Sequence, residues 1–202
     1  MVTYRGVMYG AGKGQLGNNM KNWGYFKAFT VDSNVLSGLC SLIMLVILVK
    51  NLVKKTDILP KWAVVLQLVS ASAVGLTFLV VLTFLAPMQV AAGHSYFTSF
   101  SGDMFFFHFL NPVLAGVMAC RFADRYKITM KYKCLAMIPF VIYAIVYVYE
   151  AVITKHWMDF YGFTFGGKNQ VVPFVVAIIA AAQFFIITVL SFFHNKKSQR
   201  GE

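Results

Sequence analysis

The chain has few charged residues. Asp, Glu, Lys and Arg make up 12% of its 202 residues, whereas hydrophobic residues make up 59%. A soluble domain carries about 25% charged residues, so this composition excludes an ordinary water-exposed surface. The apolar residues are gathered in long runs, as contact with lipid requires. Because such runs must pair every backbone polar group within the segment, they predict an all-α membrane protein.

The sequence also lacks the spacings that mark metal sites. Its three cysteines form no Cys-x-x-Cys pair, and its four histidines form no His-Glu-x-x-His or His-x-His pattern. Such spacings bring several ligands to one face of a helix or turn. We therefore expect no metal ion and no other cofactor.

Five apolar runs are each long enough to cross a membrane, for which a helix needs about 20 residues and as few as about 17. They predict a polytopic bundle over residues 30–194, between a polar, glycine-rich tail (1–29) and a basic tail (195–202). The expected spanning helices cover 31–49, 62–88, 104–120, 134–153 and 171–193.

The basic residues lie mainly between these runs and predict an orientation. The 50–61 loop, the 121–133 loop and the C-terminal tail together hold 12 Lys and Arg, whereas the other side of the bundle holds 6. Since basic loops are retained in the cytoplasm, we expect the N-terminus outside and the C-terminus inside. Anionic headgroups, and not nucleic acid, are then the expected partners of the net charge of +11.

Polar residues inside the runs collect at the outer ends of the helices. The first group is Phe29-Thr30-Val31-Asp32-Ser33-Asn34. Thr30 and Asn34 are four residues apart and would share one face of a helix. Thr, Asp, Ser and Asn are also the preferred helix-capping residues, so capping is the simpler interpretation.

The second group is His108-Phe-Leu-Asn111-Pro112. A histidine inside a membrane helix either makes a structural hydrogen bond to another helix or marks a functional site. Taken together, Thr30 and His108 could form a nucleophile and its base, because a threonine needs a base to take its proton. The residues considered for orienting the base or stabilising an oxyanion are Asp32, Ser33, Asn34, Asp103, Asn111 and Glu150.

At these motifs the chain resembles the integral membrane threonine hydrolases of the androgen-induced (FAR-17a-like) family and their bacterial relatives. The resemblance rests on Phe29-Thr30-x-x-Ser33-Asn34, on His108-x-x-x-Pro112 and on an aromatic stretch at 157–163. It implies a hydrolase of fatty-acyl esters, such as fatty acid esters of hydroxy fatty acids, with Thr30 as nucleophile and His108 as base. Relatives usually carry a further hydrophobic helix before the first motif and prolines in the aromatic stretch, whereas here residues 1–25 are polar and glycine-rich and the stretch holds no proline.

The expected enzyme is thus an integral protein of a bacterial plasma membrane, with its active site facing outward and a lipid as its substrate. The acyl chain would enter between helices past the four phenylalanines Phe105, Phe106, Phe107 and Phe109. The alternative is a non-catalytic protein that binds a lipid or transports a small solute through the same polar pocket.

Overall fold

The computed structural model describes residues 24–121 and 126–198. It is 81% helical, and the described residues contain no strand. Five helical segments are long and apolar enough to cross a membrane: Phe29–Lys54, Lys61–Ala91, Asp103–Arg121, Met130–Ile153 and Asn169–Lys196. The predicted all-α polytopic bundle and all five predicted spans are therefore confirmed, each span being somewhat longer than its apolar run.

Most of the spans combine α-helical turns with the wider turns of a π-helix or the narrower turns of a 3-10 helix. In chain order the elements are η1 (Gly24–Lys27), α2 (Phe29–Lys54), α3 (Lys61–Val80), η2 (Val81–Leu85), α4 (Ala86–Ala91), η3 (Tyr96–Phe100), α5 (Asp103–Phe105), η4 (Phe106–Leu110), α6 (Asn111–Arg121), α7 (Met130–Tyr147), η5 (Val148–Ile153), η6 (Asn169–Val171) and α8 (Val172–Ser198). Helix α8 thus continues past residue 194, where the bundle was predicted to end, because Lys and Ser can prolong a helix beyond the hydrocarbon layer.

Two of the spans contain a π-helical turn just before a proline. The turn η2 contains Thr83, four residues before Pro87, and η4 contains His108, four residues before Pro112. A proline donates no hydrogen bond to the carbonyl four residues earlier, and its ring crowds that carbonyl. A widened π turn relieves this crowding without ending the helix.

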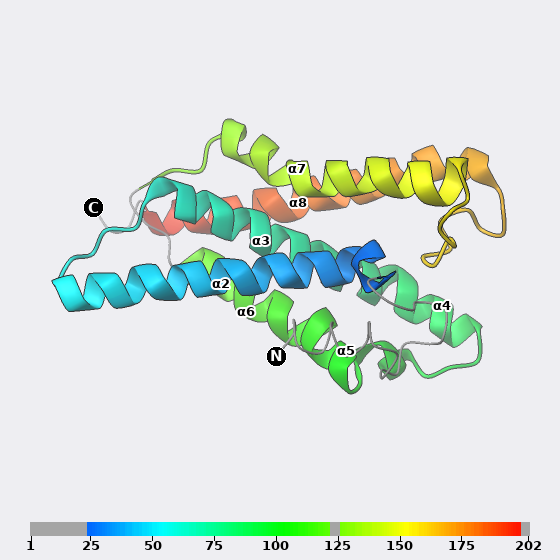
Figure 1. Cartoon of the computed structure of the whole chain (residues 1–202), viewed down its shortest axis with the longest axis horizontal. Coiled ribbons are helices and arrows are strands. Elements are labelled where there is room, and N and C mark those ends of the chain that lie inside the picture. The colour runs from blue at the N-terminus through cyan, green and yellow to red at the C-terminus, as the bar shows by residue number, and fades with distance from the viewer. Residues whose placement is uncertain (1–23, 122–125, 199–202) are drawn as a thin grey trace.

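Helix α3 lies at the centre of the bundle and contacts α2, α6, α7 and α8. In Figure 1 it runs between α2, α6 and α7, and α8 lies beside α7. Small residues on α3 permit this close packing, since Ala63, Ala71 and Ala73 are almost fully buried. By contrast, α2 packs mainly on α3 and exposes much of its length.

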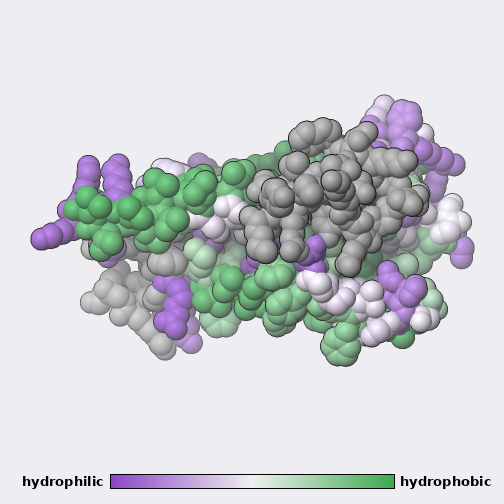
Figure 2. Space-filling view, turned by 60° about the horizontal axis from the view of Figure 1, so that its bottom comes forward, coloured by the Kyte–Doolittle hydropathy of each residue, from purple (hydrophilic) through white to green (hydrophobic). Residues whose placement is uncertain are grey.

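The surface has the pattern expected for a spanning bundle. Figure 2 shows apolar residues along the middle of the molecule and hydrophilic residues towards its two ends. Exposed side chains on the spans include Leu39, Leu42, Ile142, Ile178 and Phe185. Exposed large hydrophobic residues of this number belong in lipid rather than in water.

Candidate functional site

The N-terminal end of α2 is not capped by its own polar residues. Its N-cap residue is Ala28, and no side chain caps the helix at that position. Thr30 and Asn34 lie inside the helix, where the Asn34 side chain donates to the Thr30 carbonyl over 2.7 Å. The capping interpretation is therefore wrong for this motif, and the expectation that the two residues share a face is confirmed.

Tyr161, from a distant part of the chain, caps α2, and Tyr143 binds the end of η1 just before it. The backbone N–H of Phe29 donates to the Tyr161 hydroxyl over 2.9 Å. The Tyr143 hydroxyl, from α7, donates to the carbonyl of Lys27 over 2.8 Å. A free N–H at a helix start needs such a partner when it is shielded from water. The sequence analysis missed both tyrosines, although Tyr161 lies in the aromatic stretch that contributed to the resemblance.

Asn34 connects the start of α2 to the segment that carries His108. Besides the Thr30 carbonyl, its Nδ2 approaches the Phe107 carbonyl at 3.3 Å. Its Oδ1 accepts a hydrogen bond of 2.9 Å from Nδ2 of Asn111. Asn34 is 1% exposed, so these bonds form away from water and keep the two motifs adjacent. The structure thus brings together the two groups that the sequence singled out.

His108 is buried, and its Nδ1 lies 2.6 Å from the carbonyl oxygen of Ser99. A carbonyl can only accept, so Nδ1 carries the proton and Nε2 of the neutral ring keeps its lone pair. The ring also meets Phe100 edge-on, at 6.4 Å between centroids. The group that binds Nδ1 and orients the His108 ring is therefore a backbone carbonyl and not a carboxylate. Within the described residues no hydrogen bond joins His108 to Thr30.

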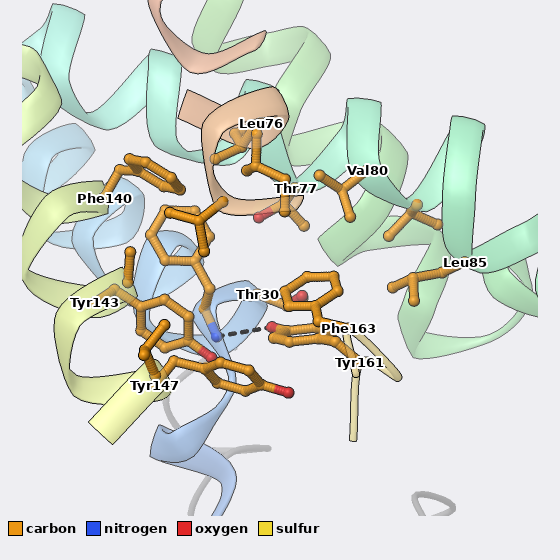
Figure 3. Close-up of a pocket in the computed structure, with 16 residues that line it drawn as sticks. Thr30, Leu76, Thr77, Val80, Leu85, Phe140, Tyr143, Tyr147, Tyr161 and Phe163 are labelled. Carbon is orange, nitrogen blue, oxygen red and sulfur yellow. Dashed lines mark hydrogen bonds between the residues drawn. The ribbon is translucent and has the colours of Figure 1, made fainter. Parts of the chain in front are cut away.

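Thr30 lines an apolar cavity of about 50 Å³, which we call the Thr30 cavity. Figure 3 shows Thr30 and Tyr161 close together at its edge, among side chains from α3 and α7. The Thr30 and Tyr143 side chains both lie near enough to the Tyr161 hydroxyl to affect its pKa, which burial raises. The cavity is lined by Phe29, Thr30, Leu76, Thr77, Val80, Val81, Leu85, Phe140, Tyr143, Ala144, Tyr147, Val148, Tyr161, Phe163, Val176 and Ile179.

Ser33 lies one turn below Thr30 and belongs to the same polar cluster. Its hydroxyl lies 3.0 Å from the Thr77 hydroxyl and 3.2 Å from the Thr30 carbonyl. Since Ser33 is 2% exposed, these bonds satisfy it inside the bundle. Ser33 therefore ties α2 to α3 beneath the cavity, while the Thr30 hydroxyl remains on its lining.

The carboxylates considered for orienting His108 lie in different surroundings. Glu150 approaches His156, with 3.3 Å between Oε2 and Nδ1. Asp103 is the first residue of α5. Asp32 lines a second cavity, between α2 and α7, whose lining does not include His108. In the described parts of the chain, no group of three or more His, Cys, Asp and Glu side chains is arranged to hold a metal ion.

The phenylalanines expected to line a substrate channel lie on α5 and η4. Phe105, Phe106 and Phe109 are each about 40% exposed, whereas Phe107 is buried. None of the four lines the Thr30 cavity or the second cavity. Phe105 and Phe109 instead stack on each other, at 5.4 Å between ring centroids.

The loop between η5 and α8 is held over the Thr30 cavity by Asp159. Its carboxylate accepts hydrogen bonds from the Tyr147 hydroxyl (2.5 Å), from the backbone N–H of Phe163 (3.0 Å) and from both the backbone N–H and the hydroxyl of Thr164 (2.8 and 2.7 Å). Burial alone would raise the pKa of Asp159, but these hydrogen bonds outweigh it and lower the pKa. The charged carboxylate thus fixes the fold of the loop.

The same loop contributes an aromatic cluster around Tyr147 of α7. The Tyr147 ring lies 5.6 Å from those of both Tyr161 and Phe163, and 5.4 Å from that of Phe160. Aromatic pairs at such distances add stability beyond the area they bury. Three members of this cluster, Tyr147, Tyr161 and Phe163, line the Thr30 cavity.

No family model, curated protein or solved structure matches this chain. The assignment of a function therefore depends on the geometry around Thr30 and on the resemblance of the motifs.

Proposed function

We propose that the chain is an intramembrane lipid ester hydrolase in which Thr30 is the nucleophile and His108 the base. The observation that carries the proposal is that Thr30 lines an apolar cavity beside the hydroxyl of Tyr161. An apolar cavity with a few convergent polar groups is the usual form of a site for a small apolar ligand.

In the proposed reaction the Thr30 oxygen attacks the ester carbonyl as its proton passes to Nε2 of His108. The tetrahedral intermediate expels the alcohol, which takes that proton, and leaves an acyl group on Thr30. A water molecule, deprotonated by His108, then releases the fatty acid. The Ser99 carbonyl at Nδ1 supports this assignment, because it keeps Nε2 free as the acceptor.

The oxyanion needs a donor that is not already occupied. The Phe29 N–H donates to Tyr161, and Asn34 Nδ2 donates to the Thr30 and Phe107 carbonyls. The Tyr161 oxygen accepts the Phe29 bond, and the Thr30 and Tyr143 side chains lie beside the same hydroxyl. In the proposed reaction the Tyr161 hydroxyl turns its proton to the ester oxygen. We therefore assign the oxyanion contact to Tyr161, whose raised pKa keeps it protonated at neutral pH.

Base catalysis requires Nε2 of His108 to come within about 2.6–3.2 Å of the Thr30 oxygen. The Asn34–Asn111 hydrogen bond supports this, because it ties the second turn of α2 to the start of α6, three residues after His108. The proposal therefore requires that substrate binding draw these two segments together.

Labelling with a fluorophosphonate activity probe tests the proposal on the full chain in nanodiscs. Thr30→Ala and His108→Ala should each lower labelling by at least about a thousandfold, as loss of a nucleophile or base does. Thr30→Ser should retain labelling because it keeps the hydroxyl. The matched control is Thr83→Ala, which removes a hydroxyl bonded only to the Leu79 carbonyl. Full labelling of Thr30→Ala, with the protein still folded, would refute the assignment.

The alternative is a lipid-binding protein without catalysis. It is favoured by the absence of a Thr30–His108 hydrogen bond within the described residues and by the second, larger cavity between α2 and α7. It predicts saturable lipid binding that Thr30→Ala leaves intact, and no probe labelling of the wild-type protein.

A further inference from the structure

The second cavity is a groove of about 260 Å³ between α2 and α7, with α3 as its floor. We call it the α2/α7 groove. It faces the lipid, because Ile142 and Val146 on its rim are 59% and 40% exposed. It extends from the aromatic side chains at the outer ends of the helices to Leu36, which lies seven residues beyond Phe29, or about 10 Å along a helix. Its lining is Phe26, Phe29, Asp32, Ser33, Leu36, Ala73, Pro139, Ile142, Tyr143, Val146 and Trp157.

Two side chains separate this groove from the Thr30 cavity. Phe29 and Tyr143 line both spaces, and their rings pack against each other at 5.1 Å between centroids. Each is held at one end by a hydrogen bond, from the Phe29 N–H to Tyr161 and from the Tyr143 hydroxyl to Lys27. The partition between the two spaces is therefore a single pair of rings.

The Thr30 cavity alone is too small for a fatty-acyl ester, because ligand pockets usually measure about 300–1,000 Å³. The two spaces of about 50 and about 260 Å³ approach the lower end of this range only when they are joined. A rotation of the Phe29 and Tyr143 rings would join them. The substrate path to Thr30 therefore runs through this partition.

Among the described residues, the charged side chain that lines the path is acidic. Asp32 lies in the groove, and in the described part of the chain its carboxylate has no hydrogen bond or ion pair. Among residues 24–121 and 126–198, no Lys, Arg or His lines the groove or the Thr30 cavity. The ammonium of Lys27 lies over the Trp157 ring, 5.4 Å from its centroid. A free carboxylate on a ligand would thus meet Asp32 without a compensating cation in the lining.

We propose that the α2/α7 groove is the entrance through which an uncharged fatty-acyl ester passes from the bilayer to Thr30, and that Phe29 and Tyr143 form its gate. The proposal rests on the proposed function. It places the entrance away from Phe105, Phe106 and Phe109, which line neither space. It also narrows the substrate class, because Asp32 disfavours esters that carry a free carboxylate, and these include the fatty acid esters of hydroxy fatty acids that the resemblance implies.

Photocrosslinking tests the entrance without requiring hydrolysis. The full chain, as wild type and as Thr30→Ala, is placed in nanodiscs with a diazirine-bearing fatty-acyl methyl ester, and modified residues are mapped by mass spectrometry. Modification of Leu36, Ile142 and Val146 should fall at least about fivefold when excess unlabelled ester competes for the same site. The matched control is Ile178 of α8, which is 70% exposed and lines neither space, so its modification should not respond to competitor.

The outcomes separate the two proposals. If the groove residues respond to competitor no more than Ile178 does, the entrance is refuted, even if the protein hydrolyses esters. If the groove residues are protected but no ester is hydrolysed, the groove is retained as a lipid site and the proposed hydrolase fails.

The charge preference has its own test in the same assay. A competitor ester with a free carboxylate should protect the groove at least about tenfold less well than the uncharged ester, given the repulsion between two like charges a few ångströms apart near a protein surface. In Asp32→Asn the difference in protection between the charged and the uncharged competitor should be smaller. Equal protection by both competitors in the wild-type protein would overturn the preference for an uncharged substrate.

Discussion

Replacing Asp159 by Asn should release the loop that covers the Thr30 cavity. The carboxylate accepts four hydrogen bonds, and all four donors approach its two oxygens. An amide has only one oxygen, so its NH₂ group must face either the Tyr147 and Phe163 donors or the two Thr164 donors. Two of the four bonds to an acceptor oxygen are then lost. The hydroxyl of the affected pair can turn and accept from the amide, but the backbone N–H is left facing another donor.

The size of the effect follows from the strength of these bonds. A hydrogen bond to a charged group contributes about 1.5–3 kcal/mol, but Asp159 is partly exposed and water replaces some of the loss. We expect about 2 kcal/mol in total, which corresponds to a roughly thirtyfold increase in the opening equilibrium of the loop. The loop should open locally, since the aromatic cluster around Tyr147 still holds part of it.

Hydrogen–deuterium exchange of the full chain in nanodiscs measures this equilibrium. Amides of residues 160–168 should exchange about thirtyfold faster in Asp159→Asn, while amides of α3 keep their rates. The matched control is Asp57→Asn, which changes an exposed aspartate in the loop before α3. Unchanged exchange at 160–168 in Asp159→Asn would show that the carboxylate does not hold the loop.

Three further changes have defined outcomes. The pKa of Asp159 in the folded protein lies below its unfolded value of about 3.9. The contribution of its carboxylate to folding stability is therefore present above about pH 4 and is lost as the pH falls through the folded pKa. The difference in Tm between wild type and Asp159→Asn should accordingly shrink below about pH 4. Asn111→Ala removes the hydrogen bond to Asn34 and should cost about 0.6–2 kcal/mol of stability, measured by thermal unfolding in detergent against Asn169→Ala as control; no change in Tm would contradict the link. Gly162→Ala places a Cβ at φ +70° and 3.1 Å from the Met88 side chain, and should accelerate exchange of the loop amides by about tenfold; unaltered exchange would show that the turn tolerates a side chain.

The spanning helices could be predicted because the cause of their formation is local. Each apolar run contains within itself the backbone hydrogen bonds that lipid demands, so its position in the sequence is enough to locate the helix. The predicted ends of the helices were less accurate. The first span was expected over 31–49, but α2 begins at Phe29 and continues to Lys54, because Lys and Asn residues near the headgroups can remain helical. Composition marks the hydrocarbon layer, and the helix itself continues beyond it.

The site was predicted in part. The spacing of Thr30 and Asn34 correctly placed both on one face, and Asn34 does lead to the His108 segment. The sequence could not show that Tyr143 and Tyr161 complete the start of α2, because those contacts join residues more than 100 positions apart. Nor could it show Asp32 in a groove, since that depends on α2 and α7 both flanking α3 without filling the space between them.

The capping of α2 by Tyr161 has a consequence for the order in which the molecule is assembled. The two partners are 132 residues apart, so α2 is synthesised long before the hydroxyl that completes its first turn exists. Until the segment that carries Tyr161 has been made, the Phe29 N–H and the Thr30 turn must remain at the water interface or find a temporary partner. Completion of the Thr30 cavity is therefore a late event of biogenesis, and a nascent chain that stops before Tyr161 leaves its first helix unfinished.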